Sequence, residues 1–202
     1  RPAINEGRAD YAPVFLPDVP RLFETGAVPL DHVFINVTPP EAHGFCSLSV
    51  SVEAMHAAIR AATTVIAQLN PALPRTLGES FIHIDDIDLA IEVDQPPFER
   101  AVDPIGEVER RIGEHVADLV PDGATLQLGI GAIPAATALA LTDRRDLGVH
   151  TEMFTDSIVD LVEAGVVNGS RKERNVGKIV TAFMMGSRRL YEFAHDNPMI
   201  EM

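Results

Sequence analysis

Short apolar runs in the first half of the chain predict strands around one main helix. Val33–Val37 and Thr63–Leu69 are rich in β-branched residues and end before proline-containing turns, so both predict strands, the first of them buried. Residues 82–93 predict one or two further strands. Residues 52–62 carry apolar side chains at helical spacing and predict a helix, and Asp18–Phe23 predicts a single helical turn.

Helices and strands alternate in the second half, after a proline-rich linker formed by Gln95–Phe98 and Asp103-Pro104. Five apolar residues at helical spacing predict an amphipathic helix: Ile105, Val108, Ile112, Val116 and Leu119. We then expect a strand from Thr125 into a glycine turn, a helix near Pro134–Leu141 and a strand near Val149–Phe154. A helix at Ile158–Ala164 would be capped within Thr155–Ser157 and stopped by Gly165. A strand within Gly177–Met185 and a helix at Arg188–His195 would follow. This alternation is typical of a parallel, doubly wound sheet, so the predicted fold class is α/β.

The stretch Thr125–Pro134 has the order of a strand, a glycine turn and the start of a helix. Gly129 and Gly131 permit positive φ and let a ligand approach the bare main chain. Pro134 suits the first helical position, where its missing N–H has no partner in any case. A helix N-terminus behind such a turn presents free N–H groups that favour an anion or a developing oxyanion.

A carboxylate follows this turn at a second strand end. Glu152 and His150 are two residues apart and share one face if the segment is extended. A carboxylate can attack an activated acyl group, and the negative charge that develops on the carbonyl oxygen then needs donors such as the Gly129–Ile133 turn. The spacing therefore predicts a reaction site on adjacent strand ends.

Each of these features also has a purely structural interpretation. The Gly129-x-Gly131 turn could be an ordinary connection, and a dinucleotide site is disfavoured because Pro134 stands where that fingerprint has a third Gly or Ala. Glu152 by itself could be a solvated carboxylate, and we interpret His150 as a structural residue bonded to the backbone. The basic cluster 171–174 is interpreted as a solvated loop, with contact to a phosphate as the alternative.

Composition limits the classes of partner. The chain has 202 residues, 46% of them hydrophobic, and Lys+Arg 16 against Asp+Glu 30 gives a net charge of −14. Such a chain is a poor candidate for binding nucleic acid or anionic membranes. A single cysteine, Cys46, excludes an internal disulfide and suits a reducing cytoplasm. The histidines show no metal-binding spacing, so no metal site is expected.

The ordered motifs resemble one known family. The run GATLQLGIGAIP, followed by LGVHTEMFTDSIVDLVEAGVV and GKIVTAFMMGSRRLYEF, resembles the acetyl-CoA hydrolase/transferase family, with its best match in the 4-hydroxybutyrate CoA-transferase branch. The earlier segments EGRADYAPVFLPDVPRLF, TPPEAHGFCSLSVSVEA and PRTLGESFIHIDDID extend this resemblance over nearly the whole chain. Because members of the family are longer at both ends, we expect the chain to be an internal piece.

The resemblance implies two open α/β domains with parallel or mixed sheets, both incomplete. Residues 1–100 would be the last part of the N-terminal domain plus a linker, and residues 101–202 the first part of the C-terminal domain. Glu152 would be the catalytic nucleophile. The CoA-binding and oxyanion-stabilising loop would consist of Gly129, Ile130, Gly131, Ala132 and Ile133.

The resemblance also implies ping-pong transfer of CoA between an acyl-CoA and a short-chain carboxylate, through a thioester on Glu152. Acyl-CoA and carboxylates would be substrates, and no cofactor would be needed because thioester and anhydride are both activated acyl derivatives. We expect a cytoplasmic homo-oligomer that binds neither nucleic acid nor membrane. Acyl-CoA hydrolysis in the same site and a non-catalytic CoA-binding module remain as alternatives.

Overall fold

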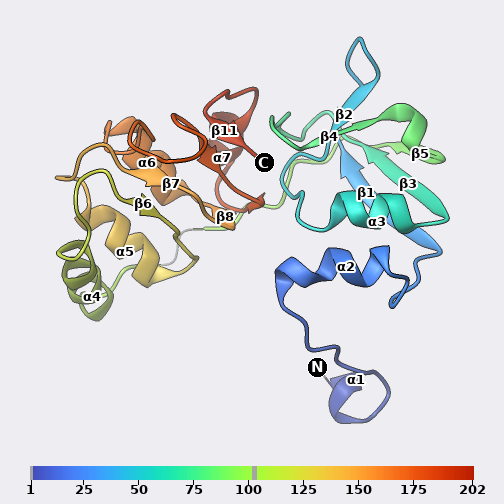
Figure 1. Ribbon diagram of the computed structural model, residues 1–202, viewed down its shortest axis with the longest axis horizontal. Helices are drawn as coiled ribbons and strands as arrows, with labels where there is room; N and C mark the ends of the chain where they lie inside the picture. Colours follow the sequence, from blue (N-terminus) through green and yellow to red (C-terminus); the bar gives the residue numbers. More distant parts are fainter. Residues whose placement is uncertain (1, 102–103) are drawn as a thin grey trace.

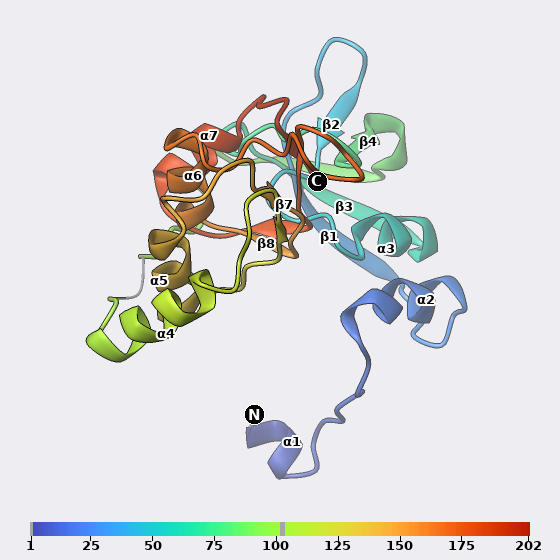
Figure 2. The same ribbon diagram turned by 60° about the vertical axis from the view of Figure 1, so that its left-hand side comes forward.

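The computed structural model describes residues 2–101 and 104–202, and it shows two α/β halves (Figure 1). The expected linker residue Asp103 lies outside the described residues. An N-terminal arm carrying the short helix α1 reaches away from the body in both views (Figures 1 and 2). The predicted mixed α/β class is confirmed.

Helix α3 packs on one face of a three-stranded parallel sheet in the first half, and α2 lies beside α3 (Figure 1). The sheet has the order β1-β3-β5, and β2 pairs with β4 in an antiparallel ladder. The elements of this half are α1 Pro2–Asn5, the 3₁₀ helix η1 Leu16–Asp18, α2 Val19–Glu24, β1 His32–Val37, β2 Phe45–Ser47, α3 Met55–Ala61, β3 Thr64–Leu69, β4 Phe81–His83, the 3₁₀ helix η2 Ile84–Asp86 and β5 Leu89–Glu92.

The two faces of the β1-β3-β5 sheet differ in burial. Alternation along β1 buries Val33, Ile35 and Val37 and exposes Phe34. Leu89 in β5 lies in the same cross-strand row as Phe34 and is also exposed. Parallel sheets are normally covered on both faces, so the exposure of this apolar face is unusual.

Every strand pair of the second half is parallel. β6 pairs with β7, β8 with β10, and β9 with β11, and an isolated bridge between His150 and Val180 joins β7 to β9. The elements of this half are α4 Glu107–Ala117, β6 Thr125–Leu126, α5 Ala132–Ala140, β7 Gly148–Val149, β8 Met153–Phe154, α6 Asp156–Glu163, β9 Ile179–Val180, β10 Phe183–Met184, α7 Arg188–Ala194 and β11 Ile200–Glu201.

The structure divides two strands that the sequence predicts as continuous. The expected strand 149–154 is divided into β7 and β8, and the expected strand within 177–185 into β9 and β10. The register is unchanged across the break, because His150↔Val180 and Met153↔Phe183 have the same offset. The interruption arises at Glu152, whose carbonyl accepts hydrogen bonds from the N–H groups of both Ala182 and Phe183, at 3.0 Å each. One carbonyl thus serves two donors, although no extra residue is inserted in either strand.

Helix boundaries also differ from the expectation in places. Helix α5 begins at Ala132, so Pro134 is its third residue and not its first. This position is tolerated because the first four N–H groups of a helix have no intrahelical acceptor. The predicted stop at Gly165 is confirmed, since it has φ +75° and its N–H donates to the Val162 carbonyl at 2.9 Å.

Helix α4 is confirmed as a helix, but its predicted apolar stripe faces outward. Val108 and Leu119 are 66% and 82% exposed, whereas Gly113 and Ala117 are the buried residues of α4. Gly113 lets the backbone of α5 approach closely, because a Cβ added there would lie 2.6 Å from the Ala136 carbonyl carbon. Helices α4 and α5 therefore pack through small residues.

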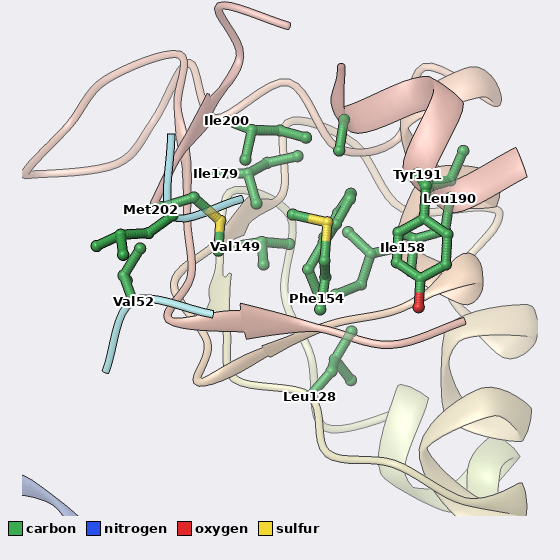
Figure 3. Close-up of a cluster of buried hydrophobic side chains, with 14 of the residues drawn as sticks. Val52, Leu128, Val149, Phe154, Ile158, Ile179, Leu190, Tyr191, Ile200 and Met202 are labelled. Carbon is green, nitrogen blue, oxygen red and sulfur yellow. The ribbon is translucent and has the colours of Figure 1, made fainter. Parts of the chain in front are cut away.

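The hydrophobic core is continuous across both halves. Figure 3 shows Val52 from the first half beside Val149, Ile179 and Met202 of the second half, within one buried cluster. Backbone pairing supports this contact, because the Val52 N–H donates to the Ala182 carbonyl at 2.9 Å. The segment after β2 therefore adds a short antiparallel partner to the edge of β10.

We predict that Gly113→Ala lowers the free energy of unfolding by about 1 kcal/mol or more, because the clash with the α5 backbone outweighs the gain in helix propensity. Urea unfolding measures the change. Arg111→Ala, an exposed substitution in the same helix, is the control and should leave the midpoint nearly unchanged. A stabilised Gly113→Ala protein would contradict the close packing of α4 on α5.

Candidate active site

The expected nucleophile and the expected glycine loop lie on neighbouring strands. In the β6–β7 ladder Thr125 pairs with Gly148 and Leu126 with Val149. The same register, continued past the ladder, sets Gly129 beside Glu152. Both residues are exposed and belong to the same alternating face, since Leu128 and Thr151 between them point into the core. The adjacent strand ends that the sequence predicts are therefore present.

Thr151 fastens these two segments together. Its Oγ1 accepts a hydrogen bond from the Leu128 N–H at 3.1 Å and donates to the Leu128 carbonyl at 2.8 Å. Thr151 is 5% exposed, so both bonds are shielded from water. Thr151, which precedes Glu152, is therefore hydrogen-bonded to Leu128, which precedes Gly129. Sequence reasoning missed this role, because a buried threonine in a strand has many ordinary explanations.

The glycine loop offers a row of unused donors. Among the residues that the structure describes, no hydrogen-bond acceptor is found for the N–H groups of Gly129, Ile130, Gly131, Ala132 or Ile133. Gly131 is the N-cap residue of α5 and has φ +114°, a conformation that favours glycine. A Cβ added at Gly131 would meet nothing within 4 Å, so the main chain there is open to a ligand. These donors and the helix dipole favour a negative charge.

Glu152 is held through its main chain while its carboxylate stays accessible. Its carbonyl accepts three hydrogen bonds, the third from the Thr181 hydroxyl at 3.0 Å. The carboxylate makes no ion pair or hydrogen bond with another described residue. His150 is exposed, and its ring likewise bonds no described residue, so our interpretation of this ring as bonded to the backbone is wrong. The Glu152 carboxylate is therefore free to react.

A small cleft lies behind the glycine loop. Gly129, Ile130 and Gly131 form one wall, and Met153 with the start of α6 forms another. Asp156, at that start, is buried and accepts hydrogen bonds from the N–H (2.9 Å) and the hydroxyl of Ser187. Asp156 thereby ties α6 to the N-terminus of α7.

The capping predicted for α6 is only partly correct. Thr155 is the N-cap residue, but its hydroxyl bonds the Ser157 hydroxyl at 3.0 Å and not a backbone N–H. Helix α6 also begins at Asp156, two residues before the expected Ile158.

The basic loop 171–174 is not wholly solvated. Lys172 is 6% exposed, and its ammonium donates to the carbonyls of Val149 at 2.9 Å and Lys178 at 2.6 Å. Burial lowers the pKa of Lys172, and the negative charge of Glu201 partly opposes this shift. Arg171, Glu173 and Arg174 of the same loop are exposed. Lys172 therefore joins β7 to the start of β9, while its neighbours face solvent.

The described residues contain no group of three or more His, Cys, Asp or Glu that could hold a metal ion. Within the same part of the chain, no helix has both the length and the apolar character needed to cross a bilayer.

Comparison with known proteins gives consistent matches. A family model described as the acetyl-CoA hydrolase/transferase N-terminal domain matches residues 1–101. The chain is 48% identical to the 4-hydroxybutyrate coenzyme A transferase of Clostridium kluyveri, covering 100% of this chain and 47% of that protein. It is also 48% identical to the succinyl-CoA:acetate/propanoyl-CoA:succinate CoA transferase of Fasciola hepatica, covering 100% of this chain and 42% of that protein.

A solved structure has the same fold. The 4-hydroxybutyrate CoA-transferase of Porphyromonas gingivalis superposes with a TM-score of 0.89 at 41% identity, over 99% of this chain and 52% of the other. The chain therefore spans about half the length of the proteins that it matches.

We predict that Thr151→Val, which removes both hydrogen bonds to Leu128 at nearly constant volume, lowers the free energy of unfolding by about 1–3 kcal/mol. It should also speed amide hydrogen exchange at Leu128, whose N–H loses its acceptor. Thr151→Ser keeps the hydroxyl and is the matched control, with a smaller effect. Equal exchange rates at Leu128 in all three proteins would show that the Thr151 hydroxyl does not fasten the loop.

Proposed function

This chain belongs to the acetyl-CoA hydrolase/transferase family, and we propose that the protein of which it forms part is a CoA-transferase. In this proposal it moves CoA between an acyl-CoA, such as acetyl-CoA or 4-hydroxybutyryl-CoA, and a short-chain carboxylate. The relatives described above are CoA-transferases, which supports the reaction class. The observation that carries the proposal is the parallel register that sets Glu152 beside Gly129 and its row of free N–H groups.

The reaction would begin with attack on the thioester. A carboxylate oxygen of Glu152 attacks the acyl carbonyl carbon, and the N–H groups of Gly129–Ile133 stabilise the oxyanion. The C–S bond then breaks, which leaves an acyl-glutamyl anhydride and the CoA thiolate. The thiolate attacks the Glu152 carbonyl carbon, releases the first carboxylate and leaves a glutamyl-CoA thioester.

The second half would reverse these steps with a new carboxylate. The incoming carboxylate attacks the glutamyl thioester, CoA thiolate leaves, and the thiolate then attacks the acyl carbon of the new anhydride. This regenerates the Glu152 carboxylate and releases a new acyl-CoA. Every intermediate is an activated acyl derivative, so the cycle requires neither ATP nor a cofactor.

We also propose that residues 1–100 end one domain of the protein and residues 101–202 begin the next. The family-model match supports this division, because it ends at residue 101, within the linker. A cytoplasmic location suits the free thiol of Cys46 and a supply of acyl-CoA.

Hydrolysis of acyl-CoA in the same site is the second candidate. It is favoured by the exposure of Glu152, because water that reaches the glutamyl thioester would release CoA. The two activities differ only in how well the closed site excludes water.

We predict that Glu152→Gln lowers kcat for transfer by at least about a thousandfold, because an amide is not a competent nucleophile. Initial rates of acyl transfer from acetyl-CoA to a second carboxylate, measured on the full-length protein, test this. Glu192→Gln, which removes an exposed carboxylate paired with Arg188, is the control and should keep normal activity. Activity retained in Glu152→Gln would overturn the nucleophile assignment.

Free CoA release separates transferase from hydrolase. For a transferase, we expect little free CoA from acetyl-CoA alone and a rapid appearance of new acyl-CoA once a second carboxylate is added. A thiol reagent measures free CoA, and chromatography measures the acyl-CoA. Continuous CoA release that added carboxylate does not suppress would identify a hydrolase.

A further inference from the structure

We propose that the cleft beside the basic loop 171–174 binds the phosphate groups of the CoA substrate. This inference rests on the proposed function and adds to it a binding subsite for the part of CoA remote from the thioester. The cleft has a volume of about 430 Å³. Besides the loop residues, it is lined by Gly123, Thr125 and His150.

The cleft shares a face of the sheet with the nucleophile. Gly148, His150 and Glu152 alternate with core-facing residues, so their side-chain positions lie on one side of β7 and the segment after it. The stem of Lys172 covers Gly148, where an added Cβ would collide with it. His150 therefore lies between the basic loop and Glu152. At a rise of about 3.3 Å per residue, the Gly148 level is roughly 13 Å from the Glu152 level.

Both positions lie on one face of the sheet, so a single extended ligand can span them. In CoA a flexible pantetheine arm separates the sulfur from the pyrophosphate and the 3′-phosphate. A thioester held at Glu152 beside Gly129 can thus send its arm past His150 and reach the loop 171–174 with its phosphates.

The loop carries the charge that phosphates need. Arg171, Lys172 and Arg174 against Glu173 give a local charge of +2, in a chain with a net charge of −14. Arg171 and Arg174 are exposed, and no carboxylate among the described residues forms an ion pair with either of them. Most other exposed arginines are paired, for example Arg189 with Asp160 at 2.6 Å. Two unpaired guanidinium groups at one cleft are therefore available for an anion.

Arginine is suited to this task by its geometry. The planar guanidinium offers parallel N–H donors to phosphate oxygens and keeps its charge at any working pH. The Arg171 side chain is also placed by packing, because it lies over Gly123, where an added Cβ would be 2.8 Å from Nε. One arginine is thus oriented by the fold, and Arg174, three residues later, completes the cationic edge of the cleft.

The test compares acetyl-CoA with acetyl-pantetheine, which has the same thioester but no phosphates, on the full-length protein. For Arg174→Gln and Arg171→Gln, we expect kcat/KM for acetyl-CoA to fall by about tenfold or more each, since a lost contact of about 1.4 kcal/mol is a factor of ten. kcat/KM for acetyl-pantetheine should stay at the wild-type value. Arg110→Gln on α4 removes one exposed cation at a distance and is the matched charge control.

Two results would overturn the subsite. An equal fall in kcat/KM for both substrates would show that the arginines act only on the structure. Because Arg171 also packs over Gly123, the result for Arg174→Gln is the one that separates phosphate binding from packing. An unchanged kcat/KM for acetyl-CoA would show that phosphates do not bind there. If the wild-type protein still forms its covalent intermediate on Glu152 in that case, the subsite fails while the proposed function stands.

Discussion

The parallel register between the strand 125–128 and the strand that begins at Gly148 is the constraint on which the candidate site depends. It aligns Gly129 with Glu152, and the two-way hydrogen bond of Thr151 with Leu128 prevents the two segments from sliding. A shift of one residue would turn Glu152 toward the core and Thr151 toward solvent. The buried residues of this sheet therefore also decide which side chain can react.

The interruption of the next strand pair has a related effect. Regular pairing would engage the Glu152 carbonyl once, whereas here it accepts bonds from Thr181, Ala182 and Phe183. The main chain of the nucleophile is thus held from the side opposite the glycine loop. Because Ser51 and Val52 pair with Phe183 and Ala182, the first half of the chain supports the same strand from its other side. Rigid support for an accessible carboxylate is what preorganised catalysis requires.

The sequence was informative where a local signal exists. Apolar, β-branched runs located the strands around Val33–Val37 and Thr63–Leu69, helical spacing located the helix α4, and the glycines located the loop at Gly129. The strands β2 and β11 escaped prediction because they have three and two residues, too few to show alternation. The exposure of the apolar side chains of α4 could not be predicted either, since hydrophobic spacing does not show which face of a helix packs against the rest of the protein. Nor could spacing reveal the Thr151 hydrogen bonds, which depend on a partner at Leu128 that is distant in sequence.

The most direct test of Glu152 as the nucleophile is to trap the covalent intermediate on the full-length protein. Incubation with acetyl-CoA, reduction with borohydride and peptide mapping by mass spectrometry would report a glutamyl thioester as the corresponding alcohol. We expect a modification at Glu152 that is absent from Glu152→Gln. Turnover of acetyl-CoA with Glu152 unmodified would contradict it and direct attention to hydrolysis without a covalent step or to another nucleophile.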